Sequence, residues 1–511
     1  MRASTPTRDP RRVPTRPAGD RRPPTRRRTS TFVLGDTRQR GAVLLIVTGL
    51  VLTIFGGRLV QLQAVQGEAL ASEALDQRLR TQSIPAGRGM ILDAGGDALA
   101  ITMEARNLTA DQTLVTDPQA VAEQLGPILG ADPAVLAERL TGERRFMYVA
   151  KGLTPEAWDR IAELRLPGIF SEPTARRVYP AGDLAANVVG FVGGEGTGLG
   201  GVEYAYEQEL AGTPGEQTFE RGPGGRVIPT GANSVTDAMQ GTSIRLTIDR
   251  DIQYVAQQAL AEKVAESRAD SGTLVVMDPR TGHILALATV PTFNPGKAAS
   301  ATASNRGNRA LTDVFEPGST SKLMTLAAVI NEGKANPYTS ITVPSSLTRG
   351  DKKFHDASPH GTLRLTLAGV MAKSSNMGTI LAAERIGGKK LYKYLKKFGI
   401  GEPTGLDFPG ESTGFIPKHS DWSPTSFPTI AFGQGLSVNA VQSASVFATI
   451  ANDGVRVQPS LVDALILPDG TVSAAPEPEA TRGGSVSTAK QVRAMRERVV
   501  SEGGTAPMAA I

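Results

Sequence analysis

The stretch FEPGSTSKLMTLAAVI, residues 315–330, is the most informative part of this chain. A Pro-Gly break precedes Ser319, and an apolar run follows Lys322. This pattern predicts a turn that leads into a helix, with the serine at the helix start. Residues three apart lie on one face of a helix, so the Ser319 hydroxyl and the Lys322 amine are expected to meet.

The pair is suited to nucleophilic catalysis. A serine hydroxyl is a weak nucleophile unless a nearby base takes its proton. A lysine amine can be that base where burial lowers its pKa, and the positive end of a helix also disfavours a proton on Lys322. A Ser-x-x-Lys match arises often by chance, however. On its own it favours a helix-start serine beside a solvated lysine.

A second motif changes that balance. Ser374-Ser375-Asn376 precedes another helix-like run. Ser-x-x-Lys followed by Ser-x-Asn is the active-site pattern of penicillin-binding proteins and serine β-lactamases. Its third element, Lys-Thr-Gly, does not occur in the sequence. The nearest match, RTG at 280–282, lies between two apolar runs and predicts a hairpin turn.

Length and composition bound the class of protein. A chain of 511 residues can hold two or three domains. It has no cysteine, which excludes disulfides, thiol catalysis and zinc–thiolate sites. The net charge is +5, but residues 1–40 hold twelve Arg and three Asp, so that segment is +9 and the rest is −4. The Arg- and Pro-rich segment 1–40 is expected to be a disordered cytoplasmic tail.

An uncharged segment, 41–57, follows the tail and is long enough to approach a membrane span. We expect a transmembrane helix over 41–63, with the basic tail inside and the later residues outside the cytoplasm. A buried helix and a cleaved signal peptide are the alternatives. The cleavage-like Ala-Leu-Ala at 69–71 lies well beyond the apolar run, and the leading region is too long for a signal peptide. Nucleic-acid binding by the tail need not be invoked.

Two further regions follow. Residues 64–80 are expected to continue the membrane helix, and the rest of 64–235 is mixed, with many Gly and Pro. The GTGLGG stretch at 196–201 matches a dinucleotide fingerprint, but such a site needs βαβ units around it, so a structural role is favoured. In 236–511, strands surround helices without strict alternation, which predicts an α/β or α+β domain. We expect a loop over 467–485 and a final helix capped by Ser487.

Other segments complete a family pattern in the right order: RGMILD at 88–93, RVYP at 177–180, GLGGVE at 198–203, TGLD at 404–407 and GQG at 433–435. From residue 41 onward the chain resembles class B penicillin-binding proteins, which are peptidoglycan transpeptidases anchored by one N-terminal helix. The resemblance implies a transpeptidase domain of the serine β-lactamase type on a mixed, β-rich dimerisation or pedestal domain. The septal, cell-division member is the most similar, and the elongation-type relative is the alternative.

The resemblance also implies a mechanism. Ser319 would attack the penultimate D-Ala carbonyl of a stem peptide, and Lys322 would accept its proton. Ser374 would shuttle a proton to the leaving D-Ala, while Asn376 would hydrogen-bond the substrate and orient the lysine. Gly433, Gln434 and Gly435 would bind substrate. The implied partners are stem peptides, β-lactams, the membrane, a polytopic glycosyltransferase and other division proteins, with no cofactor and no metal.

Two features depart from a simple assignment. An EGGTA segment at 502–506 resembles the one that precedes Lys-Thr-Gly in the family, and the sequence stops at Ile511. We expect an incomplete fragment of an active transpeptidase; the alternative is a non-catalytic scaffold of the division complex. His355 and His360, with Asp356 between them, are interpreted as structural because their spacing suits neither a helix face nor a strand face. No partner pattern supports a Ser-His-Asp triad at His283 or His419.

Overall fold

The computed structural model describes residues 37–68, 70, 72, 78–220, 228, 231 and 233–510. The expected disordered tail lies outside the described residues except for 37–40, which are helical. The chain divides into two compact units, each considered by itself. One comprises residues 1–79 and 220–227, and the other comprises residues 80–219 and 228–511.

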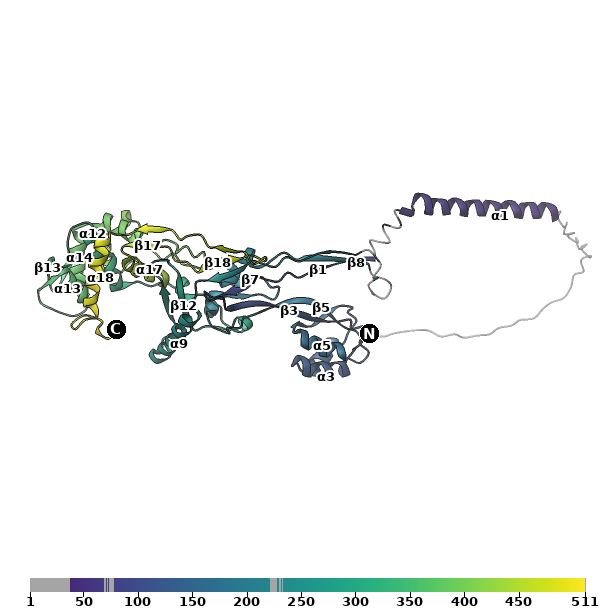
Figure 1. The fold of residues 1–511 in the computed structure, drawn as a ribbon, viewed down its shortest axis with the longest axis horizontal. Coiled ribbons are helices and arrows are strands. Elements are labelled where there is room, and N and C mark those ends of the chain that lie inside the picture. Colours follow the sequence, from purple (N-terminus) through teal and green to yellow (C-terminus); the bar gives the residue numbers. More distant parts are fainter. Residues whose placement is uncertain are drawn as a thin grey trace, which may run out of the picture. The chain divides into compact units, whose positions relative to one another are not determined.

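In the first unit the main element is helix α1, Thr37–Val60, the long helix labelled in Figure 1. It continues as the π-helix η1, Gln61–Val65. The segment Arg38–Val65 is the one helix of the described residues that is long and apolar enough to cross a membrane. We expected residues 64–80 to continue this helix. That prediction is wrong at its C-terminal end, because strand β1, Leu79–Ile84, begins at residue 79.

The second unit is built on a seven-stranded sheet whose longest strand is β3, Ala98–Ala110. It pairs antiparallel along almost its whole length with β5, Ile169–Val178, and over part of it with β4, Met147–Leu153. The remaining strands come from distant parts of the sequence, namely β2 (Ile91–Leu92), β10 (Ser243–Leu246), β18 (Val462–Ile466) and β19 (Val472–Ala474). The sheet therefore combines the pedestal segment with the C-terminal third of the chain.

Three short helices cover one end of this sheet: α3 (Pro118–Leu129), α4 (Pro133–Leu140) and α5 (Pro155–Glu163). Each begins with a proline behind an Asp or Thr cap whose side chain accepts a backbone N–H. Proline suits the first helical position because its missing N–H has no partner there anyway. The buried faces of the helices pack with Leu108 of β3 and Val149 of β4 into one apolar cluster.

The glycine-rich fingerprint forms a hairpin of β6, Phe191–Val192, and β7, Gly198–Gly200, rather than a phosphate loop. A Cβ on Gly198 would lie 1.9 Å from the carbonyl oxygen of Glu203, in the helix that follows. Glycine is required there because the backbone of that helix packs directly against the hairpin.

The C-terminal part contains a helical core around α12, Lys322–Asn331, in which every residue from 322 to 330 is buried. Helices α14 (Asn376–Glu384), α15 (Gly388–Lys397) and α18 (Val486–Val500) pack against it, and α13 (Leu367–Ala372) packs against α18 (Figure 1). This apolar core fixes the position of the residues at the N-terminal end of α12.

Next to this core, helix α9, Arg250–Ser267, packs on the hairpin of β11 (Gly272–Met277) and β12 (Ile284–Val290). The hairpin predicted around residues 280–282 is thus confirmed. Two other predictions are wrong. The expected loop 467–485 contains β19, which pairs with β18, and β20, Ala480–Arg482. The last helix is capped by Ser485 rather than Ser487, because Asn331 holds the Ser485 backbone N–H at the helix start.

Candidate active site

Ser319 lies in a short 3-10 helix, Gly318–Ser321, that runs directly into α12. The left-handed φ of 54° at Gly318 turns the chain into this helix. Ser319 is exposed, whereas Lys322, one turn later, is 3% exposed. The predicted turn, helix and serine at the helix start are confirmed. The helix therefore carries an exposed serine one turn before a buried lysine.

The amine of Lys322 is held by Ser374. Its Nζ donates to the Ser374 carbonyl oxygen at 2.5 Å and to the Ser374 hydroxyl at 3.1 Å. Burial lowers the pKa of Lys322 from 10.5 to about 8, although the negative charge of Asp356 acts in the opposite direction. An amine with a pKa near 8 is partly neutral at physiological pH, so it can accept a proton.

The Ser374–Asn376 turn connects α13 to α14. Ser374 has a φ of 53°, in the left-handed region that serine seldom adopts. Ser375 caps α14, its hydroxyl accepting the Gly378 N–H at 2.9 Å. Asn376 is the first residue of the helix, and its Nδ2 donates to the His355 carbonyl oxygen at 3.0 Å. The turn thus presents the Ser374 oxygens to Lys322.

Residues 433–435 lie beside the nucleophile turn. The Gly318 N–H donates to the Gly433 carbonyl oxygen at 2.9 Å, and the Gly435 N–H donates to a carboxylate oxygen of Glu316 at 2.8 Å. Gly433 has a φ of 94°, and a Cβ there would lie 1.9 Å from the Gly318 carbonyl oxygen. Only glycine permits this approach. Gln434 between the two glycines is exposed.

A hydrogen-bonded pair, Asp356 and His360, borders the same site, although the sequence analysis interprets His360 as structural. One oxygen of Asp356 accepts the Ser375 hydroxyl at 2.7 Å, and the other accepts the Met377 N–H at 3.0 Å. His360 Nε2 lies 2.9 Å from the same carboxylate. Burial alone would raise the pKa of the Asp356 carboxyl, but these hydrogen bonds outweigh it and lower the pKa.

The His360 ring has its own shift. Its hydrogen bond to the Gly361 carbonyl oxygen, followed by the one to Asp356, raises the pKa of the imidazole. The spacing of these residues does not suit a metal site, and within the described residues no group of three or more His, Asp or Glu could hold a metal ion. The contacts of Asp356 with Ser375 and Met377 have no local sequence signal, because these two partners lie about twenty residues further along the chain.

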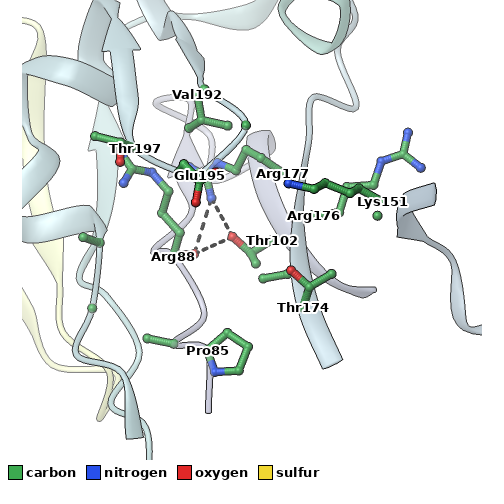
Figure 2. Close-up of a pocket in the computed structure, with 18 of the residues that line it drawn as sticks. Pro85, Arg88, Thr102, Lys151, Thr174, Arg176, Arg177, Val192, Glu195 and Thr197 are labelled. Carbon is green, nitrogen blue, oxygen red and sulfur yellow. Dashed lines mark hydrogen bonds between the residues drawn. The ribbon is translucent and has the colours of Figure 1, made fainter. Parts of the chain in front are cut away.

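A separate cleft of about 920 Å³ lies in the pedestal, lined mainly by residues 83–214 (Figure 2). Behind its wall the carboxylate of Glu203, which is fully buried, accepts the Nε of Arg88 at 2.6 Å and the Nε of Arg177 at 2.7 Å. Arg177 also donates to the Thr102 hydroxyl and to the Gly89 carbonyl oxygen. Arg88, Arg177 and Glu203 belong to the RGMILD, RVYP and GLGGVE segments, so the three segments are joined by one ion cluster.

The fold and the two motifs together define a penicillin-binding transpeptidase. A model of the penicillin-binding protein transpeptidase domain matches residues 272–510, and a model of the penicillin-binding protein dimerisation domain matches residues 83–246. The chain belongs to the class B penicillin-binding proteins, in which these two domains occur on one chain.

Individual relatives support this assignment over most of their length. Penicillin-binding protein PbpB of Mycolicibacterium smegmatis is 37% identical over 519 residues, which covers 95% of this chain and 79% of the relative. Peptidoglycan D,D-transpeptidase FtsI of Escherichia coli is 32% identical over 438 residues, covering 83% and 74%. The crystal structure of penicillin-binding protein 3 from Mycobacterium tuberculosis with aztreonam aligns with a TM-score of 0.66 at 33% identity, covering 84% of this chain and 80% of that chain.

Proposed function

We propose that this protein is a peptidoglycan D,D-transpeptidase that crosslinks stem peptides during septal cell-wall synthesis. The observation that carries the proposal is the buried Lys322 amine, which has a lowered pKa and lies one helical turn after the exposed Ser319. An exposed hydroxyl and a partly neutral amine are the two groups that serine acyl transfer requires.

In the first half-reaction the Ser319 oxygen attacks the carbonyl carbon of the penultimate D-Ala, and its proton passes to Lys322. The tetrahedral intermediate then expels the terminal D-Ala, whose amine takes a proton through the Ser374 hydroxyl, leaving an ester on the serine. The 3.1 Å hydrogen bond between the lysine and Ser374 supports this route. The Ser319 backbone N–H would stabilise the oxyanion.

In the second half-reaction an amine of another stem peptide attacks the ester carbon. The attacking amine loses its proton to the base, the Ser319–acyl bond breaks, and the serine regains a proton. Asn376 at the start of α14 would hold the donor peptide, and residues 433–435, beside the serine turn, would line the path of its backbone. The products are a crosslinked peptide and free enzyme.

β-Lactams resemble the acyl-D-Ala-D-Ala end of the donor peptide, so they should acylate the same serine. The penicillin-binding protein 3 structures from M. tuberculosis are described as complexes with aztreonam and ampicillin. This likeness supports β-lactams as ligands of the present protein.

A fluorescent penicillin tests the proposal on the protein expressed from its complete reading frame. The wild type should be labelled covalently, while Ser319→Ala and Lys322→Ala should not. Ser358→Ala changes an exposed serine in the neighbouring loop and should be labelled like the wild type. Absence of labelling in the wild type would support a non-catalytic scaffold, and full labelling of Ser319→Ala would show that another residue is the nucleophile.

The membrane arrangement extends the proposal. We infer a cytoplasmic tail over 1–40, a membrane span over 41–63, and a pedestal (64–235) and transpeptidase region (236–511) outside the cytoplasm. The apolar helix Arg38–Val65 and the basic residues before it support this topology. In that arrangement the enzyme would reach polymerised cell wall, and its partners would include a polytopic glycosyltransferase and other division proteins.

A further inference from the structure

The side chain of Asp356 connects a surface loop to the turn that carries Ser374. The loop lies between β15 (Lys352–Phe354) and β16 (Leu363–Thr366), and the Asp356 side chain is only 10% exposed. One carboxylate oxygen accepts the hydroxyl of the cap residue Ser375, and the other accepts the N–H of Met377 in the first turn of α14. A single side chain therefore fixes both the cap and the first turn of that helix.

The turn needs such support because Ser374 adopts a left-handed backbone conformation. For a residue with a Cβ this costs about 1–2 kcal/mol and persists only where the surroundings hold it. From the α13 side, the Ser374 and Ser375 N–H groups donate to the carbonyl oxygens of Met371 and Val370. From the other side, Asp356 holds the turn. Both acceptors of the Lys322 amine belong to Ser374, so a shift of the turn would displace the amine.

His360 fixes the carboxylate in turn. Its Nε2 faces Asp356 at 2.9 Å, and its Nδ1 faces the Gly361 carbonyl oxygen at 2.5 Å. A carbonyl oxygen and an ionised carboxylate can only accept hydrogen bonds, so both ring nitrogens must carry hydrogen to satisfy this geometry. The arrangement is therefore that of an imidazolium paired with a carboxylate.

We propose that Asp356 and His360 are positioning residues for acyl transfer: the carboxylate fixes the Ser374–Asn376 turn, and the imidazolium fixes the carboxylate. This inference rests on the proposed function. Neither side chain needs to touch the substrate. Both act through the two Ser374 oxygens that hold the Lys322 amine.

The pair also influences the base through its charge. Within the described residues, the charged side chains that interact with Asp356 are His360 of the same loop and Lys322 of α12, while its hydrogen-bond partners at the start of α14, Ser375 and Met377, are neutral. The carboxylate raises the pKa of Lys322 against the effect of burial, and the imidazolium offsets part of that carboxylate charge. Removing either member should change both the geometry and the basicity of the amine.

The test is the pH dependence of β-lactam acylation in the protein expressed from its complete reading frame. Asp356→Asn keeps the shape of the side chain but removes its charge and one acceptor. The plateau rate at high pH should fall about ten- to a hundredfold, as expected for a misplaced reacting group. The midpoint of the profile should move to lower pH because Lys322 loses the charge that raises its pKa.

Three further variants separate the effects. Ser375→Ala removes one hydrogen bond and leaves the carboxylate charge, so the plateau should fall while the midpoint stays in place. His360→Gln removes the cation, so the midpoint should move to higher pH, opposite to Asp356→Asn. Asp351→Asn changes an exposed carboxylate on the preceding hairpin and should match the wild type in both respects. If Asp356→Asn fails to fold, Ser375→Ala and His360→Gln carry the test.

The outcomes are distinguishable. If the wild type is acylated at Ser319 but Asp356→Asn keeps the wild-type plateau and midpoint, the positioning role is refuted while the proposed function stands. A loss of melting temperature and plateau rate with no movement of the midpoint in Asp356→Asn would indicate a merely structural carboxylate and would also refute it. A wild type that is not acylated, or a Ser319→Ala protein that is, refutes the proposed function itself.

Discussion

The buried amine of Lys322 should make β-lactam acylation depend on pH, with a midpoint near 8. The side chain is 3% exposed, and burial lowers its pKa from 10.5 to about 8. Only the neutral amine can take the Ser319 proton. The rate should therefore follow the fraction of neutral lysine.

The size of the effect follows from that shift. At pH 7, about one amine in ten is neutral when the pKa of Lys322 is about 8. A lysine with the ordinary value of about 10.4 would be neutral in fewer than about one molecule in a thousand. Burial therefore raises the concentration of usable base by about two orders of magnitude. Without it, acylation near neutral pH would fall by a similar factor.

The assay is stopped-flow acylation with a fluorescent penicillin between pH 6 and 10, on the protein expressed from its complete reading frame. The second-order rate constant should rise about tenfold per pH unit and reach a plateau above pH 8. A rate that is flat over this range, or one that still rises at pH 10, would show that Lys322 is not the base with a lowered pKa.

The free energy of unfolding should also depend on the ionisation of the Lys322 amine. Because the folded-state pKa of Lys322 lies below the unfolded value, the unfolded chain binds more protons between about pH 8 and 10.5. The free energy of unfolding should therefore rise with pH in that window, by about 3 kcal/mol for a shift of this size. Lys322→Met should abolish acylation and remove this rise, as measured by urea unfolding at several pH values. A rise that persists in Lys322→Met would assign it to other groups.

Three further predictions concern glycine, the pedestal and the membrane. Gly433→Ala should strongly slow acylation and destabilise the fold by at least about 1–2 kcal/mol, because the φ of Gly433 is 94° and a Cβ would clash with the Gly318 carbonyl oxygen. Penicillin labelling measures the loss of acylation, and thermal melting measures the loss of stability. Glu203→Ala should lower the free energy of unfolding by about 3–5 kcal/mol, because it removes the carboxylate that contacts the buried Arg177 guanidinium and one of the two carboxylates that contact Arg88. Glu195→Ala, at an exposed acid nearby, should not, and similar urea curves for the two variants would contradict this. Protease added to spheroplasts should digest the region after residue 63 and spare the tail, and digestion of the tail alone would reverse the inferred orientation.

Local signals in the sequence were sufficient for the elements that carry the motifs. The Pro-Gly break and the apolar run predicted the turn and helix at Ser319, and the two apolar runs around residue 280 predicted a hairpin. In each case the deciding interactions join residues within a few positions of one another, so a single segment contains the information.

Interactions between distant segments could not be predicted in this way. In α9 the apolar side chain of Val255 is exposed, whereas the polar side chain of Gln253 is buried. The reason is that the Gln253 side chain accepts the N–H of Leu287 on β12, a partner more than thirty residues away. The role of Asp356 has the same origin, because it depends on contacts with Ser375 and Met377, about twenty residues further along the chain.

A comparison of two buried charged sites, around Glu203 and around Lys322, shows how buried charged residues come to differ in role. In the pedestal, Glu203 is matched by two guanidinium groups, so each buried charge has an opposite charge in contact. At the candidate active site, the hydrogen-bond acceptors of the Lys322 amine among the described residues are the two neutral oxygens of Ser374, and the nearby carboxylate of Asp356 is shared with His360. Burial with neutral acceptors favours the uncharged amine, whereas burial with a full complement of opposite charges favours the ionised groups. The neutral acceptors around Lys322 prepare a base for proton transfer, whereas the opposite charges around Glu203 join segments of the chain. The partners of each buried charge, rather than its burial, therefore indicate which role it has.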